Sequence, residues 1–272
     1  MLDVSELTRE AINQNNVGAA LIAEGDYRKS VRILSRAMRN FRSIPNFLDE
    51  SEDQEGDELD YEGNVPSIWS LFFEETKADK NDVDSSDRMR STAIDWNFSI
   101  ESSRESKGSC KNDDVEDGTV YLYREAIEIP PIAINHHQAP QMICTIVTFN
   151  LGLAHQLLAV TAAATESKEE KNKKNNPETL MRKASIFYDV SYSMLKNEFG
   201  LNSSNIWFVL AVVNNLGFCH CLATNKSARK YFEFILSLLI VLVDSGLEDI
   251  KINMYLWNVC AVLHQRSAAP AA

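Results

Sequence analysis

Apolar residues recur at helical spacing through seven stretches of the chain. Within each stretch they fall three or four residues apart, which is the period of an amphipathic α-helix. The spacing predicts helices over residues 3–23, 27–44, 141–161, 177–199, 203–223, 227–245 and 250–264. A shorter stretch, residues 119–129, alternates enough to predict an extended segment that ends before Pro130-Pro131. Together these elements predict an all-α protein with almost no strand.

One short phrase recurs in three of the predicted helices. Its copies are Asn15-Asn16-Val17-Gly18, Phe149-Asn150-Leu151-Gly152 and Asn214-Asn215-Leu216-Gly217. Each copy is followed by a second amphipathic stretch that carries a small residue: Ser30, Ala184 or Ala228. Small residues let two helices approach closely, while larger neighbours fill the space between them. The recurrence therefore predicts three antiparallel helix pairs.

These residues resemble the tetratricopeptide repeat (TPR), a unit of about 34 residues in two antiparallel helices. The first copy matches at Val17-Gly18, Leu21, Gly25, Tyr27, Ser30, Leu34 and Ala37. The second and third copies match less fully, through Gly152, His155 and Tyr188 and through Gly217, His220 and Phe232. The resemblance covers roughly residues 5–42 and 141–264, and more narrowly it is similar to a TPR-like group found in diatoms. It implies a short, interrupted array that binds other proteins.

The charge is concentrated between the first helix pair and the rest. Between Ile44 and Gly118 there are 22 acidic and 7 basic residues, a net charge of −15 in a chain whose net charge is −12. Such a composition buries too little apolar surface to fold, so most of this segment is expected to be disordered. The predicted organisation is a first hairpin (1–44), an acidic insertion (45–118), the remaining helices (119–264, one domain with 1–44) and a tail (265–272).

Composition also bears on the compartment and on the class of partner. An acidic chain repels phosphate, which argues against nucleic acid as a partner. Its five scattered cysteines do not form a disulfide framework, and its N-terminus lacks the basic and apolar regions of a signal peptide. The most apolar run, residues 234–243, is too short to span a membrane. An intracellular protein of the cytoplasm or nucleus is expected, with no membrane contact.

The resemblance also implies a partner-binding groove, because the first helices of successive repeats line a concave surface. The groove residues implied are Asn15, Asn16, Ala19, Phe149, Asn150, Leu153, Asn214, Asn215 and Phe218, with Ile22, Gln156 and Cys221 beside them. The asparagine amides before each glycine could hydrogen-bond the backbone of an extended peptide. Alternatively, they hold neighbouring helices together. Both interpretations stay open.

A basic stripe follows the second helix, where Arg28, Arg32, Arg36 and Arg39 fall on one face. Such a face is often simply solvated. A second hypothesis is that the acidic run at residues 49–62 folds back over the stripe and competes with an acidic partner.

No motif indicates catalysis, a metal or a cofactor. The tripeptide Cys219-His220-Cys221 attracts notice, but consecutive residues point in different directions around a helix and cannot share one ion. The sequence therefore predicts a non-enzymatic adaptor or scaffold that binds a peptide or helix of a partner protein. The alternatives are a regulatory subunit of an enzyme complex, or a divergent enzyme completed by a partner, and a self-associating structural protein.

Overall fold

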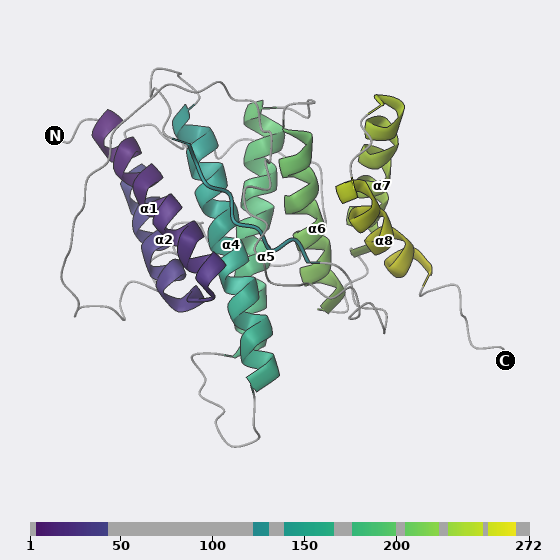
Figure 1. Cartoon of the computed structure of the whole chain (residues 1–272), viewed down its shortest axis with the longest axis horizontal. Coiled ribbons are helices and arrows are strands. Elements are labelled where there is room, and N and C mark those ends of the chain that lie inside the picture. Colours follow the sequence, from purple (N-terminus) through teal and green to yellow (C-terminus); the bar gives the residue numbers. More distant parts are fainter. Residues whose placement is uncertain are drawn as a thin grey trace, which may run out of the picture. The chain divides into compact units, whose positions relative to one another are not determined.

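The computed structural model describes residues 4–42, 122–130, 139–165, 176–199, 205–222, 228–246 and 250–264. The helices are α1 (Val4–Glu24), α2 (Tyr27–Arg42), α4 (Ala139–Thr165), α5 (Pro177–Met194), α6 (Ile206–Leu222), α7 (Ala228–Asp244) and α8 (Ile250–His264), with a π-helical extension of α5, η3 (Leu195–Phe199) (Figure 1). These ranges contain no strand, so the all-α prediction is confirmed for them. The predicted acidic insertion (45–118) and the tail (265–272) lie outside the described residues.

Local chemistry explains three of the helix boundaries. Gly25 takes a φ of 83°, a left-handed conformation that suits glycine and ends α1. Asp26 then caps α2, because its Oδ1 accepts the N–H of Lys29 at 3.2 Å. At the start of α5, the Oδ1 of Asn176 accepts the N–H of Glu178 at 3.0 Å. Asn176 therefore caps the N-terminus of α5.

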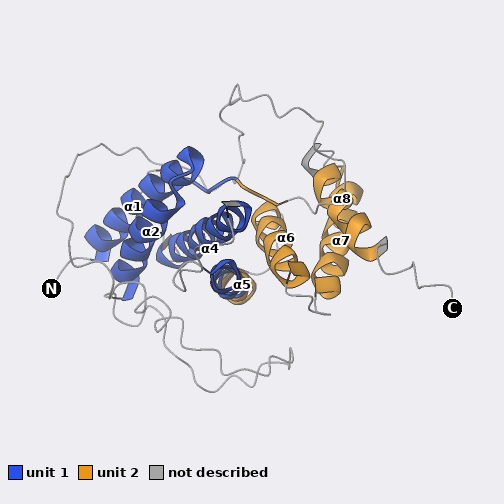
Figure 2. Ribbon diagram, turned by 90° about the horizontal axis from the view of Figure 1, so that it is seen from below, with its two compact units in different colours: residues 1–94, 125–191 blue, residues 95–124, 192–272 orange. Residues whose placement is uncertain are grey.

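The chain divides into two compact units (Figure 2). The first unit contains residues 1–94 and 125–191, and the second contains residues 95–124 and 192–272. In the first unit α1 packs on α2, and both pack on α4. In the second unit α6 packs on α7, and α7 packs on α8. Helices α4 and α6 supply the cores of these units, because nearly every residue over 141–157 and 206–217 is buried.

Each glycine of the recurring phrase lies where two helices meet. Gly18 of α1 faces Leu34 of α2, Gly152 of α4 faces Tyr188 of α5, and Gly217 of α6 faces Phe232 of α7. A Cβ at Gly18 would lie 2.6 Å from Leu34 Cγ, and a Cβ at Gly217 would lie 2.9 Å from Phe232 Cε2. The facing residue is in each pair the fourth after the small residue of the second helix. The three phrases therefore have the same packing role in three helix pairs.

Replacing Gly18 by alanine should destabilise the protein. Leu34 is fully buried, and its Cγ, the branch point of the side chain, would have to shift to admit a new Cβ. Overpacking costs about 1–3 kcal/mol, which exceeds the gain of about 1 kcal/mol in helix propensity from Gly to Ala. We expect the urea midpoint of Gly18→Ala to fall by the equivalent of about 1 kcal/mol. The neighbouring Val17→Ala, at a position 44% exposed, should leave the midpoint nearly unchanged; equal midpoints for the two variants would contradict the packing role.

Candidate functional site

The main chain of residues 122–130 is bound by asparagine side chains. In the second unit, the N–H of Tyr123 donates to Oδ1 of Asn215 at 3.0 Å, and Nδ2 of Asn215 donates to the carbonyl of Tyr123 at 2.9 Å. One amide side chain thus pairs both polar groups of one residue. We call this arrangement an asparagine clamp.

The first unit contains two such clamps. Oδ1 of Asn150 accepts a hydrogen bond from the N–H of Ile127 at 2.9 Å, and Nδ2 of Asn150 donates to the carbonyl of Ile127 at 2.8 Å. Asn16 receives the N–H of Ile129 at 2.8 Å and donates to its carbonyl at 2.7 Å. In an extended chain, residues two apart present their N–H and C=O groups to the same edge. This spacing of the bonds is the one expected where clamps bind one edge of an extended backbone, and residues 122–130 form neither helix nor strand.

Helical geometry explains why the same phrase supplies both a clamp and a packing glycine. Each clamping asparagine stands two residues before the glycine of its phrase. Two residues correspond to about 200° around an α-helix. The glycine side of the helix contacts its partner helix, so the asparagine side faces away from that contact. Each first helix of a pair can therefore hold both its neighbour and the extended segment.

The clamp at Asn150 belongs to a closed, buried network. Its Nδ2 donates to Oδ1 of Asn15 at 2.9 Å, and Nδ2 of Asn15 donates to the carbonyl of Ile127 at 3.0 Å. Asn15 and Asn150 are both fully buried. Buried amides must find partners, and a fully paired network fixes its members in place. The amides thus bind the main chain of the protein's own segment and also join α4 to α1, whereas their binding of a partner's peptide stays a prediction.

A similar network supports the clamp of the second unit. Nδ2 of Asn214 donates to Oδ1 of Asn215 at 3.3 Å, and Nδ2 of Asn258 donates to Oδ1 of Asn214. Asn258 lies on α8 and is fully buried. Sequence reasoning missed Asn258, because it stands outside the recurring phrase. Its one signal is that it is an amide among the apolar residues of Leu256–Leu263.

The side chains of the bound segment divide by polarity. Leu122, Tyr123 and Ile129 are at most 5% exposed. The charged side chains point outward: Arg124, Glu125 and Glu128 are exposed, as is Pro130. The protein therefore binds this segment through its main chain and a few apolar side chains, and leaves its charges in water.

The other predicted groove residues occupy different surroundings. Ala19 and Leu153 are buried, and Phe218 is half-buried. Phe149 packs against Tyr188 of α5, with ring centroids 5.6 Å apart. The hydroxyl of Tyr188 donates to Oε1 of Gln156 at 2.6 Å. Phe149 and Gln156 thus face α5, whereas the asparagines face the extended segment.

The basic stripe lies on the exposed side of α2. Arg28, Arg32, Arg36 and Arg39 are all exposed. Desolvation by partial burial, and then the charge of Arg36, lower the pKa of Arg39. The acidic run at residues 49–62 lies outside the described residues, so its predicted return to this stripe stays a prediction.

Histidines three residues after two of the phrase glycines have the same environment. His155 stacks on Phe187 with centroids 5.4 Å apart, and His220 stacks on Tyr231 at 5.0 Å. Burial lowers the pKa of His220. The described ranges contain no cluster of three or more metal-ligating side chains.

Cys144 is held as a neutral thiol. Full burial raises its pKa to about 12, although a hydrogen bond from Thr148 acts in the opposite direction. Its Sγ lies 3.9 Å from Sδ of Met38. A thiol with so high a pKa supplies almost no thiolate, which is the nucleophilic form. Cys144 therefore packs the contact between α4 and α2.

One helix of the described residues has the length and apolar composition to cross a membrane. It is α4, over Pro140–Ala164, and 89% of its most apolar window is buried inside the protein. Its apolar side chains pack in the core of the first unit.

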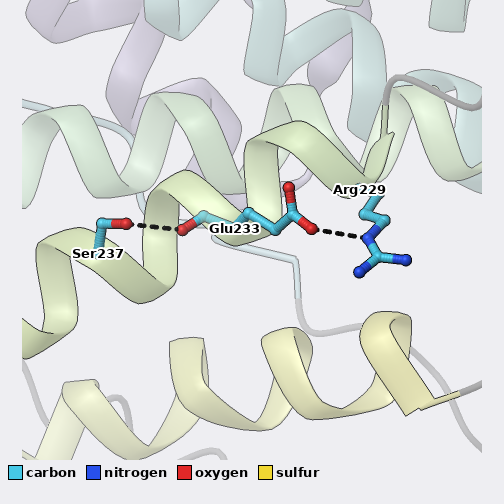
Figure 3. Close-up of polar contacts among 3 residues, drawn as sticks. All are labelled: Arg229, Glu233 and Ser237. Carbon is cyan, nitrogen blue, oxygen red and sulfur yellow. Dashed lines mark hydrogen bonds and ion pairs between the residues drawn. The ribbon is translucent and has the colours of Figure 1, made fainter.

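The outer side of α7 is polar near the start of the helix and apolar further along. Near its start, Nε of Arg229 lies 2.7 Å from Oε1 of Glu233, and the hydroxyl of Ser237 donates to the carbonyl of Glu233 (Figure 3). Further along the helix, Ile240 and Val241 are more than half exposed. Trp257 of α8 is 53% exposed. The second unit thus presents apolar side chains on α7 and α8.

Comparisons with protein-family models, with curated proteins and with solved structures find no match for this chain.

Replacing Asn150 by aspartate should break the buried network. The carboxylate cannot donate, so Oδ1 of Asn15 would lose its donor, and the carbonyl of Ile127 would keep only the bond from Asn15 while facing a buried carboxylate. Buried polar groups left unpaired cost about 1–3 kcal/mol each. We expect Asn150→Asp to lower the free energy of unfolding by at least about 2 kcal/mol, measured by urea denaturation at pH 7. Asn13→Asp, at an exposed position on α1, is the control and should change it little.

Acidification should weaken the second unit through His220. Because burial lowers the pKa of His220 in the folded state, the unfolded chain binds this proton first as the pH falls. Stability should therefore decrease as the pH falls below the ordinary histidine value of 6.5. Urea midpoints measured between pH 7.5 and 5.5 should fall less in His220→Leu, which mimics Leu21 of the first pair. Identical pH profiles for variant and wild type would contradict this assignment.

Proposed function

We propose that this protein is a non-enzymatic protein-interaction module, a TPR-like adaptor or scaffold whose asparagine clamps bind an extended segment of polypeptide. Its partner would be a protein that presents such a segment. No nucleic acid, membrane or cofactor enters this proposal, and the protein would act within the cytoplasm or nucleus.

The observation that carries the proposal is the clamp. Three asparagines, at one position of a recurring phrase, each pair the N–H and the C=O of a single residue. Amide side chains placed in this way bind the main-chain N–H and C=O groups that every peptide contains. Such contacts supply affinity with little dependence on sequence, while neighbouring apolar pockets add selectivity.

The energies involved suit reversible binding. A neutral hydrogen bond contributes about 1 kcal/mol net, so the four bonds that the clamps at Asn16 and Asn150 make to Ile127 and Ile129 contribute a modest total. Burial of one side chain such as Ile129 adds about 1.5–3 kcal/mol. An affinity built from these terms fits an adaptor that exchanges partners.

The alternatives remain distinguishable from an adaptor. A regulatory subunit of an enzyme would bind one enzyme through these same surfaces, and the adaptor proposal then describes its contact. A self-associating protein would instead use surfaces such as the exposed Ile240, Val241 and Trp257. Light scattering over a range of protein concentrations separates self-association from peptide capture.

A synthetic peptide with the sequence of residues 122–130 tests the proposal. The receptor is the full chain carrying Ile127→Pro, which removes the N–H that its own segment gives to Asn150. We expect saturable binding of the fluorescein-labelled peptide, measured by anisotropy. N-methylation of the peptide at its Ile127 amide should weaken binding about tenfold or more, because Oδ1 of Asn150 loses its donor.

The matched control is the same peptide N-methylated at its Glu128 amide. That N–H points to the opposite edge of an extended chain, so its methylation should leave the affinity nearly unchanged. Circular dichroism should show the same helix content for the receptor and the wild type. Absence of binding, or equal losses from the two methylations, would overturn the proposed function.

A further inference from the structure

The clamps of the first unit hold a segment of their own chain. Ile127 and Ile129 fill the clamps at Asn150 and Asn16, so a partner peptide would meet an occupied site. This occupancy bears on regulation as well as on recognition.

We propose that residues 125–130 are a built-in competitor for the clamps of the first unit. When this segment dissociates, an extended partner peptide takes its place in the clamps. The peptide must have an N–H at the positions of Ile127 and Ile129, and an apolar side chain at the position of Ile129. This inference rests on the proposed function and adds to it the class of partner and the means of regulation.

The way in which the segment is bound supports exchange. Asparagine side chains hold its N–H and C=O groups, and within the described part of the chain residues 124–130 form no main-chain hydrogen bond with another element. The asparagine clamps therefore make the hydrogen bonds that a neighbouring strand would make in a β-sheet. A second peptide can make the same bonds to the same amides.

The exposed side of the segment also favours release. Glu125, Glu128 and Pro130 are exposed, and Ala126 and Ile127 are half-buried. Ile129 is the one fully buried side chain among residues 125–130. Releasing the segment would therefore uncover few apolar side chains, and a partner with an apolar residue at this position would cover them again.

The clamp geometry also defines the partner. The residues clamped in the first unit are two apart, and each must donate an N–H, so proline is excluded at both positions. The residue between them turns its N–H and C=O to the other edge and is unrestricted, as the exposed Glu128 shows. The partner class is therefore an extended peptide with the spacing of Ile127-Glu128-Ile129, which tolerates acidic side chains between the clamped residues.

The expected change in peptide affinity follows from the fraction of the protein in which the clamps are open. A site that is open for only a fraction of the time has its apparent affinity reduced by that fraction. Ile127→Pro weakens the internal segment, and Glu128→Ala, on the exposed side, leaves its clamps intact. With the labelled peptide of residues 122–130, we expect Ile127→Pro to bind about tenfold more tightly than either the wild type or Glu128→Ala.

A second measurement uses the unaltered chain. Hydrogen exchange, followed by mass spectrometry with isotopically labelled peptide, should show that saturating peptide removes the protection of the amides of Ile127 and Ile129 in the chain's own segment. Protection that persists at concentrations that saturate Ile127→Pro would overturn the inference.

The outcomes separate the two proposals. Equal affinities for wild type and Ile127→Pro, each sensitive to N-methylation at Ile127, would overturn the competitor and leave the proposed function standing. Binding to neither receptor would overturn the proposed function and the competitor with it. Tighter binding to Ile127→Pro that is insensitive to the position of methylation would show a site other than the clamps, and would also overturn the inference.

Discussion

The structure depends on satisfying the polar groups of an extended backbone inside an all-helical protein. A helix pairs its own N–H and C=O groups, and a strand pairs them with another strand. Residues 122–130 belong to neither a helix nor a strand, yet the side chains of Leu122, Tyr123 and Ile129 are buried. Asparagine is suited to this task, because its amide offers a donor group and an acceptor side by side.

That constraint connects the packing of the helices to the site. The asparagine and the glycine of each phrase stand on different sides of one helix, so the close approach permitted by Gly152 against Tyr188 also positions Asn150. A larger residue at the glycine would move the helix away from its partner and shift the clamp. The packing of the helices and the binding of the chain's own segment are therefore coupled in the same four-residue phrase.

The buried asparagines also explain how the first unit holds its geometry. Asn150 bonds to Asn15 on α1 and to the carbonyl of Ile127, so one amide connects two helices and the segment. A network of this kind is intolerant of change, because removing one member takes a hydrogen-bond partner from the others in a dry interior. The same intolerance makes the site precise.

The sequence by itself determined the helices and the packing role of the phrase. Local rules decide where a helix begins and ends, as at Gly25 and Asn176, and the period of apolar residues decides which side is buried. It also indicated an extended segment before Pro130 and amides able to bind a backbone. Only the tertiary structure decided that these two features meet, because the bond between Asn16 and Ile129 joins residues 113 positions apart. Nor could periodicity show that Phe149 faces Tyr188 or that Asn258 supports Asn214, since both contacts depend on how separate helices pack.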